Sequence, residues 1–191
     1  MKLKLFMLAG IAATAIALQS YDLPKDWFKA GSQPGKYEMG IDPGKGHDGK
    51  NCATIKSTSS KIRGFGTLMQ TSLPDKYLGK RVRMSGYMKA ENVDKWAGFW
   101  LRVDKKDNDK SSAFDNMSDR PVKGTTDWKK YEIVLDVSLN AKDIAYGCLL
   151  AGTGQVWFDD IQFEVVGKDV PVTGTGIIKS VEEPSNLNFE K

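Results

Sequence analysis

The 191-residue chain has little histidine or cysteine, two side chains that catalytic and metal sites often use. It contains one histidine, His47, within the glycine-rich segment 42–49, and two cysteines, Cys52 and Cys148, that are far apart in sequence. Serine-hydrolase and zinc-protease motifs are absent. A glycosidase needs only two carboxylates about 5–10 Å apart, but no acidic pair stands out. We therefore predict a protein that is not an enzyme, with a hydrolase as the alternative.

The chain also lacks a large excess of one charge, and it lacks the residue pattern of helices. The chain has 28 basic and 24 acidic residues, and no cluster of Lys and Arg stands out. After the first twenty residues no window keeps the apolar spacing of a helix over three turns. Without a basic face or a helix-turn-helix pattern, the sequence predicts no nucleic-acid binding.

Residues 1–20 have the pattern of a secretory signal peptide. Lys2 and Lys4 precede an apolar run over 5–18, which is shorter than the roughly 20 residues of a membrane span. Cleavage is expected after Ala17, with Ser20 second and an uncleaved anchor as the alternative. The expected location is secreted or periplasmic, with no membrane span after cleavage. A disulfide is permitted there, but two isolated cysteines do not decide it, and the sequence indicates no oligomeric state.

Alternation of apolar and polar residues predicts strands through most of the chain. Three segments, 81–88, 96–103 and 128–137, place apolar side chains on one face: Val82, Met84 and Met88; Ala97, Phe99, Leu101 and Val103; Tyr131, Ile133, Leu135 and Val137. Further strands are expected at 37–42, 51–58, 65–72, 111–117, 143–151 and 155–166. Turn residues between so many strands predict an all-β, antiparallel jelly-roll β-sandwich over 21–166, followed by a linker over 167–184 and a C-terminal strand over 185–191.

The expected ligand site lies on the outward face of the 96–103 strand. Trp96 and Trp100 share that face with Arg102. Flat aromatic rings can stack on a sugar ring, and a nearby guanidinium group can hydrogen-bond its hydroxyl groups. Asp115 and Asn116 follow another strand and complete the expected site. The alternative is that a sheet or a loop covers the two indole rings.

A metal site is the hypothesis for Asp159 and Asp160. Alternation from Val156 places Asp159 in a row with Trp157 and Ile161. A carboxylate in an apolar row requires compensation, which a structural Ca²⁺ would provide. The alternative is an aspartate that accepts backbone N–H bonds in a turn.

Two segments carry a resemblance to a known fold. Thr126-x-Trp128-x-x-Tyr131 and Val156-Trp157-Phe158-Asp159-Asp160-Ile161 resemble the galactose-binding-like jelly roll of secreted carbohydrate-binding modules. The resemblance implies a carbohydrate ligand, and it implies that Asp159, with Asp160 second, helps to hold a structural calcium.

A second resemblance covers most of the chain. Segments 65–70, 79–83, 114–117, 123–128 and 186–190 are similar to a poorly characterised bacterial family often labelled as AraC-type transcriptional regulators. In jelly-roll modules a motif like Asn186-x-x-Phe189-Glu190 usually forms the first strand, so we expect this C-terminal tail to dock on the sandwich. The alternative is that the tail begins a module that has been lost. The main prediction is an exported, non-catalytic carbohydrate-binding module. A protein-interaction or sensor domain and a structural envelope protein are the alternatives.

Overall fold

The computed structural model describes residues 21–106 and 111–174, whose regular secondary structure is almost entirely strands. The expected signal peptide and the tail over 185–191 lie outside the described residues. Among those described, no helix is long and apolar enough to cross a membrane. The elements are β1 (Phe28–Gly31), the 3₁₀ turn η1 (Pro34–Lys36), β2 (Tyr37–Asp42), β3 (Cys52–Ser57), β4 (Phe65–Ser72), β5 (Arg81–Lys105), β6 (Ser111–Asp115), β7 (Val122–Asp136), β8 (Ala141–Ala151) and β9 (Gln155–Val166).

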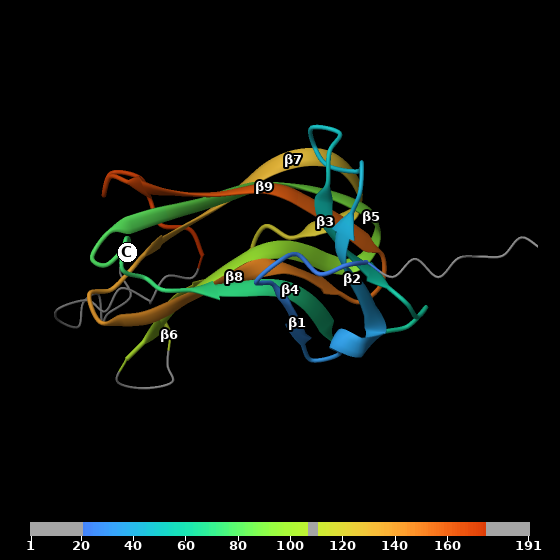
Figure 1. Ribbon diagram of the computed structural model, residues 1–191, viewed down its shortest axis with the longest axis horizontal. Helices are drawn as coiled ribbons and strands as arrows, with labels where there is room; N and C mark the ends of the chain where they lie inside the picture. The colour runs from blue at the N-terminus through green and yellow to red at the C-terminus, as the bar shows by residue number, and fades with distance from the viewer. Residues whose placement is uncertain (1–20, 107–110, 175–191) are drawn as a thin grey trace, which may run out of the picture.

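Two antiparallel sheets form the upper and lower layers of Figure 1. The first, here called the cleft sheet, contains β1, β4, β8, the second half of β5, and β6. The second, here called the back sheet, contains β7, the first half of β5, β9, β3 and β2. This arrangement confirms the predicted antiparallel jelly-roll sandwich.

Strand β5 belongs to both sheets. Its first half pairs with β7 and β9, and its second half pairs with β8 and β6. The sequence predicted two strands here, at 81–88 and 96–103. The structure joins them, because the segment between them keeps pairing with β7 through shifts of register, with Val93 opposite Gly124. Asn92, with φ of 52°, lies in this region, so the chain bends from one layer to the other without ending the strand.

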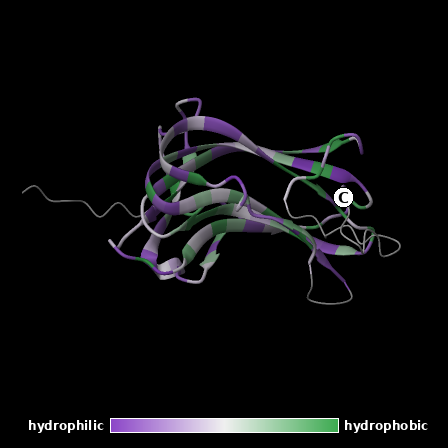
Figure 2. Ribbon diagram, turned by 180° about the vertical axis from the view of Figure 1, so that it is seen from behind, coloured by the Kyte–Doolittle hydropathy of each residue, from purple (hydrophilic) through white to green (hydrophobic). Residues whose placement is uncertain are grey.

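The core lies between the sheets and is built from the alternation seen in the sequence. The rows of β5 are buried as predicted, and so are Ile133, Leu135 and Val137 of β7, whereas Tyr131 is half-buried. Figure 2 shows hydrophobic and hydrophilic residues alternating along single strands. Burying one large apolar side chain contributes about 1.5–3 kcal/mol, so this pattern fixes which face of each strand is turned inward.

The unbroken alternation predicted for β9 is wrong in its first half. Val156 and Phe158 are in the core there, not Trp157 and Asp159, and a shift of register opposite β5 follows Asp159. Asp160 has a φ of 52°. After this bulge Ile161 and Phe163 pack against the core. Asp159 therefore does not share an inward row with them, because one extra residue reverses the faces of a strand.

The first part of the expected linker, residues 167–174, is bound to the sandwich. Arg81 Nη1 donates hydrogen bonds to the carbonyls of Lys168 and Val170, at 2.9 and 2.5 Å. Thr173 exchanges hydrogen bonds with the backbone of Val134 in β7. These eight residues are therefore a strap on the domain rather than a free linker.

The two cysteines are both buried and both free, so the disulfide that the sequence permitted is not formed. Cys148 belongs to β8 in the cleft sheet, and Cys52 belongs to β3 in the back sheet. Burial raises the pKa of the Cys148 thiol, and burial together with Asp159 and Asp42 raises that of Cys52 to about 12. Both thiols are protonated at neutral pH.

Candidate ligand-binding cleft

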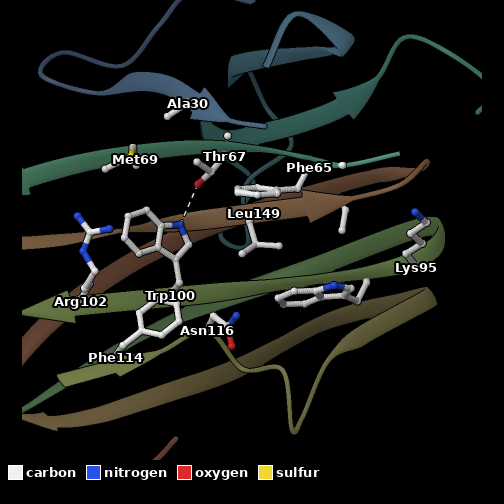
Figure 3. Close-up of a pocket in the computed structure, with 14 residues that line it drawn as sticks. Ala30, Phe65, Thr67, Met69, Lys95, Trp100, Arg102, Phe114, Asn116 and Leu149 are labelled. Atoms are coloured by element: carbon white, nitrogen blue, oxygen red, sulfur yellow. Dashed lines mark hydrogen bonds between the residues drawn. The ribbon is translucent and has the colours of Figure 1, made fainter. Parts of the chain in front are cut away.

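A cleft of about 590 Å³ lies on the outer face of the cleft sheet. Strands β4, β8 and β5 form its floor, and β1, β6 and two loops form its rim (Figure 3). Its lining residues are Ala30, Gly31, Gly64, Phe65, Thr67, Met69, Lys95, Trp96, Trp100, Arg102, Phe114, Asn116, Leu149 and Ala151. Four of the five residues that the sequence predicted for the ligand site are in this set: Trp96, Trp100, Arg102 and Asn116.

Trp100 is fixed in the floor of the cleft. Its Nε1 donates a hydrogen bond of 2.8 Å to Thr67 Oγ1 (Figure 3). The Thr67 hydroxyl in turn donates one of 2.7 Å to the Cys148 carbonyl. Trp100 lies opposite Gly147 in β8, so no side chain blocks the indole between β5 and β4. Only 7% of Trp100 is exposed. The alternative of a covered ring is therefore correct for Trp100, although one part of it still lines the cleft.

The exposed aromatic surface comes from other residues. Trp96 is half-buried, and Phe65 and Phe114 are 37% and 40% exposed. Phe65 begins β4 and Phe114 pairs with Arg102 from β6. Sequence reasoning missed both phenylalanines. Their signal was a large apolar residue at an outward strand position, which alternation alone assigns to neither the core nor a site.

Besides Thr67, three polar side chains line the same cleft. Arg102 donates from Nε and Nη2 to Asp104 Oδ2, at 3.1 and 2.8 Å, which fixes its planar guanidinium group. Asn116 Oδ1 accepts the Ser118 N–H at 3.1 Å, so its amide NH₂ remains available to a ligand. Lys95 lies at the opposite end of the cleft from Arg102 (Figure 3). The cleft thus combines aromatic faces with hydrogen-bond donors, a composition typical of sites for polar, ring-shaped ligands.

Asp115, which the sequence placed in the ligand site, does not line the cleft. It is 3% exposed and forms an ion pair of 2.6 Å with Arg120. It also accepts hydrogen bonds from the Met117 N–H and the Thr173 hydroxyl, at 2.7 and 2.6 Å. Asp115 therefore joins the loop after β6 to the strap. Because side chains alternate along a strand, Asp115 points inward where Phe114 points outward.

Asp159 and Asp160 lie on the back sheet, away from the cleft. Asp159 accepts the backbone N–H groups of His47 and Asp160, both at 2.9 Å. The imidazole of His47 stacks on Tyr87 with ring centroids 3.7 Å apart. This is the turn-type aspartate that the sequence left open as the alternative to a metal ligand.

The described residues do not suit a calcium site built from several carboxylates. Across 21–106 and 111–174, no group of three or more His, Cys, Asp or Glu side chains is placed to hold a metal ion. Calcium binding at Asp159 and Asp160 stays a prediction from resemblance, and its basis in an inward-facing row is wrong.

Comparison with known proteins identifies one close relative in sequence. No family model matches the chain. The "Uncharacterized HTH-type transcriptional regulator YbfP" of Bacillus subtilis strain 168 is 45% identical over 169 residues, which are 87% of this chain. The chain spans only 57% of the length of that relative. Its name agrees with the regulator label that the sequence resemblance suggested.

Solved structures with a similar fold share little sequence with this chain. The CBM22-1 xylan-binding domain of Paenibacillus barcinonensis Xyn10C has a TM-score of 0.54 at 13% identity, over 77% of this chain and 90% of that domain. The enzymatically active domain of bacteriophage CBA120 tailspike protein 4 has a TM-score of 0.53 at 12% identity, over 74% of this chain and 20% of that one. The fold is a jelly roll. At these identities the likeness shows the fold alone.

Proposed function

We propose that this domain is a non-catalytic binding module whose cleft takes a carbohydrate. The observation that carries the proposal is that Trp96, Phe65 and Phe114 face the same cleft as the donors of Asn116 and Arg102. Aromatic faces stack on the apolar faces of sugar rings, and the donors bind their hydroxyl groups. A volume of about 590 Å³ is within the usual range for small-ligand sites, about 300–1,000 Å³.

The fold supports the same proposal by analogy. A xylan-binding domain is among the solved structures of similar fold, although the fold by itself does not fix a function. We also propose that the protein is secreted or periplasmic, because residues 1–20 have the pattern of a signal peptide. Export would bring the cleft to external glycans.

Absence of catalysis is supported by the carboxylates near the cleft. None of the residues that line it is an Asp or Glu. Asp104 and Asp143 lie in the neighbouring pocket, and they oppose each other directly in the β5–β8 register. Glycosidases separate their two carboxylates by at least about 5 Å, so that the scissile bond fits between them. Directly opposed aspartates on neighbouring strands leave little room for a scissile bond between them.

The name of the Bacillus relative favours a second candidate function. The domain would then be the ligand-sensing part of a regulator, and the same cleft would bind the signal. Within the described residues there is no helix-turn-helix, because the helical content is the three-residue η1. A DNA-binding function would therefore need chain beyond this domain.

Glycan-array binding of the protein tests the proposal. Trp96→Ala and Phe114→Ala should each weaken binding by about 1–3 kcal/mol, the scale of one good aromatic contact, with little change in melting temperature. Trp128→Ala is the matched control, because Trp128 lies in the back sheet beside His47. Glycan binding that is unaffected by Trp96→Ala, or absent altogether, would refute the cleft as a carbohydrate site.

A further inference from the structure

The cleft continues into a second pocket at Arg102. This pocket, here called the polar extension, has a volume of about 500 Å³ and is lined by Thr71, Arg102, Asp104, Lys105, Ser111, Lys142, Asp143 and Ala145. Arg102 lines both pockets. A ligand that fills both must be longer than one sugar ring, since the cleft alone already accommodates a small ligand.

Charge is distributed unevenly along this combined groove. The cleft is lined by two cations, Lys95 and Arg102, and by no carboxylate. The polar extension adds Lys105 and Lys142 as cations. Lys95 is exposed and makes no ion pair with any other residue in the part of the chain that the structure describes. Its charge is therefore not paired with a carboxylate among the described residues.

The two carboxylates of the polar extension compensate only part of this charge. Asp104 forms an ion pair of 2.8 Å with Arg102 and neutralises it locally. Asp143 lies directly opposite Asp104 in the β5–β8 register. Burial, the charge of Asp104 and the hydrogen bond between them raise the pKa of Asp143, because two adjacent carboxylates cannot both ionise easily. The groove as a whole is cationic.

We propose that the groove is built for an acidic oligosaccharide, a chain that carries uronic-acid carboxylates. Its sugar rings pack on the aromatic cleft, and its carboxylates are attracted to Lys95 at one end and Lys142 at the other. This inference rests on the proposed carbohydrate function and names the class of ligand. A groove lined by four cations and two carboxylates has a net positive charge, which attracts an anionic chain and gives no such preference for a neutral one.

The test compares matched polymers that differ only in charge. Polygalacturonate and glucuronoxylan are each titrated beside their carboxyl-reduced forms, at low salt and at about 0.5 M salt, where the Debye length falls to about 4 Å. The acidic member of a pair should bind several-fold more tightly at low salt, and the difference should shrink at high salt.

Single-charge variants locate the effect. Lys95→Met and Lys142→Met should each lower the preference for the acidic member about two- to fivefold, the scale of one exposed ion pair. In the double variant the preference for the acidic member should fall by the product of the two single-variant factors, because the two lysines are far apart. Lys130→Met is the matched control, since Lys130 is an exposed lysine of β7 in the back sheet.

Four results would overturn the inference. Equal binding of both members of each pair, or binding of neutral glycans alone, would remove the acidic preference and leave the carbohydrate function standing. An acidic preference that the double variant retains would place its cause outside this groove. Failure to bind any glycan would remove the inference together with the proposed function.

Discussion

Replacing Asp115 should destabilise the domain far more than replacing its neighbour Asp119. Both aspartates pair with Arg120, Asp115 Oδ2 at 2.6 Å and Asp119 Oδ1 at 2.8 Å. The side chain of Asp115 is 2% exposed, whereas that of Asp119 is 62% exposed. The two variants therefore remove the same kind of ion pair from the same arginine in two different environments.

The expected magnitude follows from the groups that Asp115→Ala would leave without a partner. The buried Met117 N–H would lose its acceptor, which costs about 1–3 kcal/mol. Breaking a buried ion pair costs about 3–5 kcal/mol, but Arg120 is 31% exposed, so water would replace part of that interaction. We expect a total loss of about 3–4 kcal/mol for Asp115→Ala and at most about 1 kcal/mol for Asp119→Ala.

Urea unfolding followed by tryptophan fluorescence measures this difference. With a slope of about 2 kcal/mol per molar urea, Asp115→Ala should lower the midpoint by about 1.5–2 M and Asp119→Ala by less than about 0.5 M. Asp115→Asn, which keeps one acceptor oxygen but no charge, should lie between them. If Asp115→Ala costs no more than Asp119→Ala, the assignment of Asp115 to stability rather than to ligand binding is wrong.

Three further outcomes are expected. Trp100→Ala should cost about 3–5 kcal/mol of stability, because a buried ring is lost. Trp96→Ala should cost clearly less, since Trp96 is only half-buried. Equal falls in melting temperature for the two variants would contradict this difference in burial. Arg81 and Lys168 hold the pKa of Asp136 at about 2, below its usual 3.8. This carboxylate therefore stabilises the fold above about pH 4, and its contribution is lost as the pH falls toward 2. Asp136→Asn should make stability depend less on pH between these values, and an unchanged pH dependence would refute this role of Asp136. Because backbone N–H groups already satisfy Asp159, we expect excess chelator to leave the melting temperature unchanged. A melting temperature that chelator lowers and Ca²⁺ restores would support a calcium site instead.

Most of the strands were predictable because the alternation of apolar and polar residues shows which side chains of a strand are buried. Ala97, Phe99, Leu101 and Val103 face the core as their spacing indicates, and the same spacing correctly turned Trp96 and Trp100 outward. Local pattern specifies which face of a strand is apolar. It does not specify what lies across that face, which is why the burial of Trp100 remained open.

The errors occur where one residue changes the register or the direction of a strand. The bulge at Asp159 and Asp160 reverses the faces of β9. A bulge of one residue cannot be recognised from the sequence, because it produces no repeating pattern of apolar residues. Asp115 was assigned to the ligand site because polar residues follow it, but the strap placed Thr173 over it from 58 positions away. Such contacts between distant segments have no local signal.

The sequence by itself determined the all-β class, the antiparallel sandwich and the outward aromatic face of the 96–103 strand, because each depends on residues a few positions apart. Only the tertiary structure decided that β5 runs through both sheets and that Phe65 and Phe114 join Trp96 in one cleft. It also brought Lys95 and Lys142 to one groove. Those features depend on pairings between β4, β5, β6 and β8, and it is the packing of the whole sandwich that brings such distant segments together.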